Sequence, residues 1–138
     1  MKLNFFVADE FRPETGGKQM VLGLYADDVI LLEPVTQIEA IPVGFERLAF
    51  LINISDVPAG KHNYKGQIVD PSGKPYGREI IMGELEIEKG MSRSFIIEMK
   101  PFLINSKGTY HLNFYVDDDL YAFPFSIIDR VQEKPSTS

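Results

Sequence analysis

Hydrophobic and polar residues alternate with a period of two along most of the chain. In "RLAFLINIS" (47–55), every second residue from Leu48 to Ile54 is apolar, and "GELEIEK" (83–89) sets two aliphatic residues between glutamates. This is the period of a half-buried β-strand, and helical periodicity is nearly absent. We therefore expect strands at residues 3–7, 18–25, 47–55, 61–70, 83–89, 92–100, 109–116 and 120–128.

Turn-forming residues separate these segments. "DPSGK" (70–74) has the Asp, Pro, Ser and Gly that a type I turn favours, and glycines interrupt "PAGK" (58–61), "EKGMS" (88–92) and "NSKGT" (105–109). Short strands with turns every 8–12 residues are typical of a sandwich or a barrel. The sequence predicts an all-β, immunoglobulin-like antiparallel β-sandwich of about seven to nine strands, with a mixed barrel as the alternative.

Two regions are less regular. Residues 27–46 contain Pro34 and Pro42, which argue against a continuous helix and leave one or two further strands or a long crossover. Pro124 lacks an N–H group, so we expect the last strand to be an edge strand or to carry a bulge.

The length of 138 residues fits one domain, which we place at residues 1–131, followed by a flexible polar tail at 132–138. The chain has no cysteine, which excludes disulfides and thiolate metal sites and fits a reducing compartment. Its net charge of −6, with scattered basic residues, argues against nucleic acid and anionic membranes as partners. The apolar stretch near the N-terminus is too short for an export signal, so we expect a soluble, cytoplasmic protein.

Acidic residues cluster at two predicted strand ends. Asp9 and Glu10 follow the first strand, and a hairpin around a loop at 11–17 would bring Glu10 beside Lys18 as an exposed ion pair. Asp117, Asp118 and Asp119 form the densest cluster and are candidate Ca²⁺ ligands, if a second loop supplies further acids. The same three residues also suit a tight hairpin, because Asp tolerates left-handed backbone.

Catalytic motifs are lacking. His62 and His111 are the only histidines and have no metal-binding spacing, and the sequence contains no Gly-x-Ser-x-Gly motif. The "GGK" at 16–18 lacks the remaining residues of a phosphate-binding loop. We therefore expect a protein that is not an enzyme and has no cofactor.

Several apolar residues face away from the main stripes of their strands: Phe6, Leu51, Ile96 and Tyr115. On a single sheet they would form a patch of the kind that contacts a partner or a second copy. Alternatively, these strands are central and covered on both sides.

Three stretches resemble an uncharacterised bacterial family of small all-β proteins of unknown function. They are "VADEFRPETGGKQMVLGLYADDVI" (7–30), "VPAGKHNYKGQIVDPSGK" (57–74) and "KGTYHLNFYVDDDLYAFPFSI" (107–127), the last of which is also similar to the closing hairpin of immunoglobulin-like domains. The resemblance supports the predicted fold, and the family offers no known activity that could be expected of this chain.

The leading functional prediction is a non-catalytic protein-binding or assembly module that contacts a protein partner or itself through Phe6, Ile96 and Tyr115. The alternative is a small-ligand domain that binds calcium through Asp117, Asp118 and Asp119, or carbohydrate through loop aromatics such as Phe11, Phe45 and Tyr76.

Overall fold

The fold is described by a computed structural model, which covers residues 1–16, 18–32, 43–88, 90–104 and 106–129. These residues form eleven strands and one short 3₁₀ turn, η1 (Ala26–Asp28). The strands are β1 (Lys2–Glu14), β2 (Lys18–Leu24), β3 (Val29–Leu32), β4 (Val43–Phe45), β5 (Leu48–Ser55), β6 (Gly60–Val69), β7 (Pro75–Ile87), β8 (Arg93–Met99), β9 (Phe102–Ile104), β10 (Gly108–Val116) and β11 (Asp119–Asp129).

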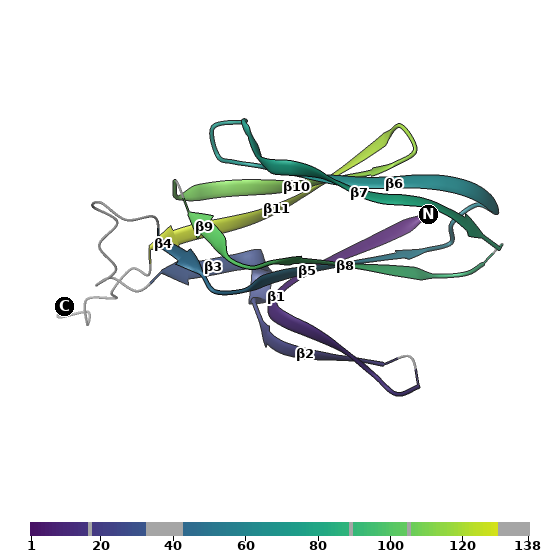
Figure 1. Cartoon of the computed structure of the whole chain (residues 1–138), viewed down its shortest axis with the longest axis horizontal. Coiled ribbons are helices and arrows are strands. Elements are labelled where there is room, and N and C mark those ends of the chain that lie inside the picture. Colours follow the sequence, from purple (N-terminus) through teal and green to yellow (C-terminus); the bar gives the residue numbers. More distant parts are fainter. Residues whose placement is uncertain (17, 33–42, 89, 105, 130–138) are drawn as a thin grey trace, which may run out of the picture.

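Two sheets face each other in two layers (Figure 1). Sheet A has the order β2-β1-β5-β8, sheet B has the order β3-β11-β10-β6-β7, and β4 and β9 form a separate two-stranded ribbon. Neighbouring strands are antiparallel except β3 and β11, which run parallel. The outer half of β1 and all of β2 extend away from the two layers as a hairpin.

The core lies between the two sheets, and the alternating stripes of the sequence form it. Every second residue from Leu48 to Ile54 on β5, and from Tyr110 to Val116 on β10, is buried. Aromatic rings bridge the layers: the ring centroids of Phe50 and Phe125 lie 4.9 Å apart. Such pairs add about 0.5–1.5 kcal/mol to the burial of their surface.

The prediction of an all-β chain is confirmed, but the described residues contain eleven strands where seven to nine were expected, and one pair is parallel. The additional strands β3, β4 and β9 have only three or four residues each. A strand this short is too brief to show a period of two. Two of them lie within residues 27–46, the stretch in which one or two further strands were expected.

The predicted register of the first hairpin is wrong. Glu14, not Glu10, lies opposite Lys18, and Glu10 lies opposite Leu22. Strand β1 continues through Pro13, because a proline fits extended backbone next to a turn at the loss of only one N–H donor. The reversal is therefore much shorter than the loop expected at 11–17.

The polar tail predicted at 132–138 lies outside the described residues. No helix in the described part of the chain is long and apolar enough to span a membrane.

Candidate binding surface

The outer face of sheet A carries a row of three large apolar side chains on adjacent strands. Phe6 on β1 pairs with Leu51 on β5, and Leu51 pairs with Ile96 on β8. Phe6 is 41% exposed and Ile96 is 38% exposed, while Leu51 between them is half-buried. We call these three residues the apolar row.

The rows on either side of the apolar row differ in character. Toward the start of β1, Asn53 donates a hydrogen bond of 2.9 Å from Nδ2 to Oγ of Ser94, so this side is polar. On the other side, Ala8 on β1 pairs with Ala49 on β5, and Ala49 pairs with Glu98 on β8. The small alanine side chains leave room above the sheet.

The β1–β2 hairpin occupies part of that room. Phe11 is only 6% exposed and packs in a small cluster with Ala8 and Ala49, against which Leu51 also lies. This cluster is separate from the main core between the sheets. We call residues 9–24 the arm, and Phe11 anchors it to the outer face beside the apolar row.

A hydrogen bond closes the base of the arm. The Tyr25 hydroxyl donates to Oδ1 of Asp9 at 2.7 Å, and burial of this hydroxyl, followed by its bond to Asp9, raises the pKa of Tyr25. Gly23 on β2 lies against Asp9 on β1 and has φ of +66°. A Cβ atom at Gly23 would collide with the Asp9 carboxylate. Both the left-handed conformation and the close approach require glycine.

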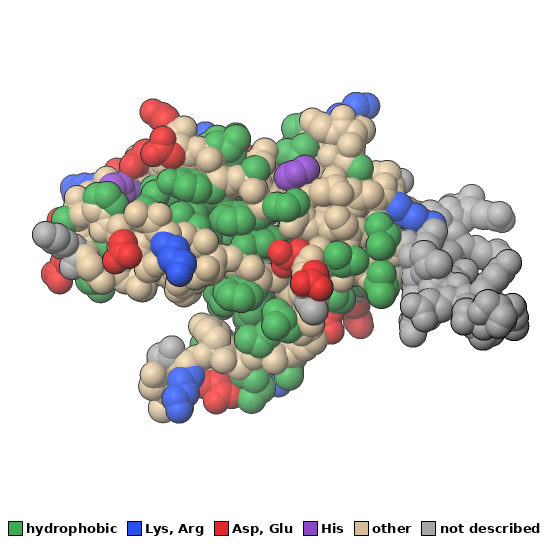
Figure 2. Space-filling view, turned by 180° about the vertical axis from the view of Figure 1, so that it is seen from behind, with side chains coloured by type: hydrophobic (Ala, Val, Ile, Leu, Met, Phe, Trp, Pro, Cys, Tyr) green, Lys and Arg blue, Asp and Glu red, His purple; other side chains and the backbone are tan. Residues whose placement is uncertain are grey.

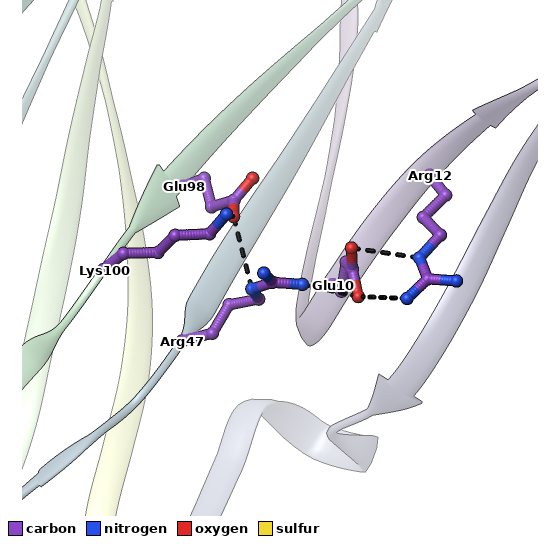
Figure 3. A network of polar contacts seen from close by, with 5 residues as sticks. All are labelled: Glu10, Arg12, Arg47, Glu98 and Lys100. Carbon is purple, nitrogen blue, oxygen red and sulfur yellow. Dashed lines mark hydrogen bonds and ion pairs between the residues drawn. The ribbon is translucent and has the colours of Figure 1, made fainter.

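Charged side chains form a network between the arm and the ends of β5 and β8 (Figure 3). Arg47 Nη1 lies 2.6 Å from Glu10 Oε2, and Arg47 Nε lies 3.3 Å from Glu98 Oε1. Arg12 pairs with Glu10 at 3.0 Å, and Lys100 pairs with Glu98 at 2.6 Å. The hydrogen bond from Arg12, with the charges of Arg12 and Arg47, holds the pKa of Glu10 below its ordinary value. Arg47 thus connects the arm to sheet A electrostatically.

An open cleft of about 880 Å³ lies at this junction. Its walls come from the arm, from the segment between β4 and β5, and from the end of β8, with a lining that includes Asp9, Glu10, Leu22, Phe45, Arg47 and Lys100. The cleft presents charges of both signs beside two apolar side chains. It is a recessed surface of mixed character beside the charged network.

Apolar surface is also exposed where the two sheets meet at the β1 and β11 edges. Viewed from behind in Figure 2, hydrophobic side chains gather between the sheets and again on the arm below them. Phe5 and Phe123 are half-buried and stack across the layers with ring centroids 4.9 Å apart. Their outer strand edges are open, because β2 pairs with β1 only from Ala8 onward and β3 pairs with β11 only from Ser126 onward.

Tyr115, the third predicted partner residue, lies on sheet B. Its neighbours across the strands are Lys65 and Leu120, and Lys65 Nζ lies 4.9 Å from the centre of the Tyr115 ring. The structure thus brings Phe6 and Ile96 together and places Tyr115 on the other layer of the molecule. One patch does not contain all three.

The first of the predicted calcium ligands, Asp117, is engaged by protein groups. Its Oδ2 lies 2.8 Å from His62 Nδ1, and its Oδ1 accepts a hydrogen bond of 2.9 Å from the Asn63 backbone N–H. His62 Nε2 lies 2.7 Å from the Pro58 carbonyl oxygen. The bond to Asp117 and that to Pro58 raise the pKa of His62, and the bonds from His62 and Asn63 lower the pKa of Asp117.

Asp118 and Asp119 follow at the exposed β10–β11 turn. Within the described residues, no three histidine or acidic side chains come together in a group that could hold a metal ion. The surroundings of Asp117 resemble a turn-stabilising ion pair more closely than a calcium site. Sequence reasoning missed this pair, because His62 and Asp117 are 55 positions apart and nothing local in the sequence connects them.

Comparison of the sequence with known protein families gives a match. The sequence profile of a family of unknown function, DUF6941, matches residues 3–127. The chain belongs to this family. The match confirms the resemblance to an uncharacterised family, and it spans both sheets and the arm of this DUF6941 chain. No curated protein matches the chain.

Proposed function

We propose that this DUF6941 chain is a non-catalytic protein-binding or assembly module, and that its binding surface is the outer face of sheet A together with the arm. The apolar row carries this proposal: Phe6, Leu51 and Ile96 are cross-strand neighbours, and two of them are more than a third exposed. Contiguous apolar side chains on the open face of a sheet favour contact with another protein.

The surroundings of the row support the same function. Interfaces combine an apolar centre with a polar rim, and here the row lies between asparagine and serine side chains on one side and the ion-pair network on the other. Because the charged groups of the network are already paired with one another, they suit the polar rim of an interface. The net charge of −6 favours a neutral or basic partner.

We also propose that the sandwich is immunoglobulin-like. Two observations support this: strands β1, β5 and β8 face strands β11, β10, β6 and β7, and the short strand β3 runs parallel to the last strand.

Affinity capture of partner proteins from cells that express this chain tests the proposal with a matched pair of variants. Phe6→Glu places a charge in the apolar row, and Ile81→Glu places the same charge on sheet B at the most exposed large apolar residue described, which is 78% exposed. We expect wild type and Ile81→Glu to retain the same proteins, quantified by mass spectrometry, and Phe6→Glu to lose them at least about tenfold, because a buried unpaired charge opposes association. Equal retention by both variants would remove sheet A as the binding surface.

A further inference from the structure

Strand β2 is an edge strand without the usual protection against pairing. Among the described residues, it has a neighbouring strand on one side only, β1. Its side chains are mainly apolar and exposed: Met20 is 41%, Val21 is 42% and Leu24 is 56% exposed. Lys18, at its first position, is its only charged residue, and the strand contains no proline.

The described strands at the other ends of the two sheets, and the open half of β11, carry features that discourage an added strand. Natural proteins block such edges with charges, prolines, bulges or very short strands. Edge strand β7 has charged residues and two register shifts, β8 has an arginine and a glutamate, β3 has four residues, and the open half of β11 contains Pro124. Among the described strands at the ends of the two sheets, β2 alone combines a seven-residue length with an apolar edge.

The free edge of β2 presents backbone groups at alternate positions. Tyr25 N donates to Val7 O at 2.9 Å, so the N–H of this residue points toward β1. The Asp9–Gly23 pair is missing from the register of β1 and β2, and the pairs from Glu10–Leu22 to Glu14–Lys18 follow without a shift. Proline has no N–H, so Pro13–Gln19 is one of the non-hydrogen-bonded pairs that alternate with hydrogen-bonded pairs in an antiparallel ladder. The N–H groups of Lys18, Met20 and Leu22 therefore point toward β1, and those of Gln19 and Val21 point outward.

We propose that the free edge of β2 pairs antiparallel with β2 of a second copy of this chain, which joins the two A sheets into one. The charges along the strand are self-complementary: Lys18 begins β2, and Asp27 and Asp28 follow its other end. Antiparallel pairing directs the Lys18 end of each copy toward the acidic end of the other. Apolar side chains then lie opposite one another along the middle of both strands.

The position of the arm allows this contact. The arm extends away from the two layers, so a second copy reaches β2 without meeting the body of the sandwich (Figure 1). A pair of seven-residue strands buries less than the roughly 1,200 Å² of a standard interface. The dimer therefore forms at high protein concentration and dissociates on dilution.

Sedimentation or light scattering over a dilution series tests the pairing. Wild type is expected to approach twice the 15.6 kDa mass of one chain at the highest concentrations. Val21→Pro removes an outward N–H while leaving the bonds to β1 intact, and should weaken the dimer at least about tenfold. Val21→Glu places a charge on the same edge and should also weaken the dimer, whereas Ile81→Glu places the same charge at an exposed position on β7 and should leave the dimer unchanged. Circular dichroism checks that each variant is folded.

Three outcomes would overturn the inference: a wild type that is monomeric throughout, a dimer that survives Val21→Pro, or a dimer lost only with Phe6→Glu. The last of these would place self-association on the apolar row, and so would support the proposed function while removing the role of β2. Conversely, a β2-dependent dimer together with equal capture of partners by Phe6→Glu and wild type would support this inference and remove the proposed function.

Discussion

At the scale of single residues, aspartates hold the turns of this protein. Asp27, Asp28, Asp56 and Asp117 all have φ between 54° and 58°, in the left-handed region that few side chains other than those of Asp and Asn adopt readily. This explains why the sequence gathers acids at strand ends. The acidic clusters that suggest metal binding in the sequence serve backbone geometry in the structure at these positions.

The His62–Asp117 pair makes stability depend on pH. The pKa of His62 is raised in the folded protein, so its contribution is present below the unfolded value of 6.5 and is lost as pH rises through the folded value. The pKa of Asp117 is lowered, so its contribution disappears as pH falls through a value below 3.8. The pair therefore stabilises the fold most between these limits.

Thermal unfolding of His62→Gln measures this contribution. The variant should lose more stability relative to wild type at about pH 5.5 than at about pH 8.5, by less than about 1 kcal/mol because the pair is near the surface. His111→Gln removes the other histidine and serves as the control. A deficit of the same size at both pH values would show that the ion pair does not contribute.

At the scale of elements, the arm depends on one aromatic anchor. Phe11 is buried against two alanines outside the main core, so the arm is held by few apolar contacts. Elements of this kind open locally at a lower free energy than the core. Gly23 and the hydrogen bond between Asp9 and Tyr25 fix the backbone at the base of the arm.

Phe11→Ala tests the anchoring. Removing a buried phenylalanine costs about 3 kcal/mol or more, and here the cost should appear as local opening of the arm. Hydrogen exchange should become faster in residues 9–24, while exchange in β5 and β10 remains as in wild type. Phe6→Ala, at an exposed position, should leave exchange in the arm nearly unchanged. Faster exchange in the core strands instead would mean that Phe11 supports the whole fold.

Strands β5, β6, β8, β10 and β11 match the predicted ranges closely, because burial on one face imposes a period of two. The two longest strands, β1 (Lys2–Glu14) and β7 (Pro75–Ile87), were predicted only in part, at 3–7 and 83–89. The short strands β3, β4 and β9 were not predictable, since their pairing depends on distant partners and not on their own three or four residues. The predicted register of the arm is wrong because the sequence pattern places Pro13 in a loop, whereas β1 continues through Pro13 to Glu14. Pro124 shows the opposite case: it lies where β11 has a neighbour on one side only, as its missing N–H predicts.

At the scale of the whole molecule, alternation assigns each side chain to a face of its strand but does not say which strands share a sheet. Phe6, Ile96 and Tyr115 all lie on the face of their strands that points away from the core, but the strand order places Tyr115 on sheet B. The network around Arg47 was also beyond the sequence, because it joins residues from β1, β5 and β8 and their ends. The apolar row thus results from strand order as much as from composition.

Site-specific photo-cross-linking in cells that express the protein shows whether the outer face of sheet A binds a protein. A photoreactive phenylalanine analogue replaces Ile96 in the apolar row or Ile81 on sheet B, both exposed. We expect a discrete cross-linked protein from position 96 and none from position 81. Adducts from position 81 alone, or from neither position, would show that the outer face of sheet A is not the binding surface.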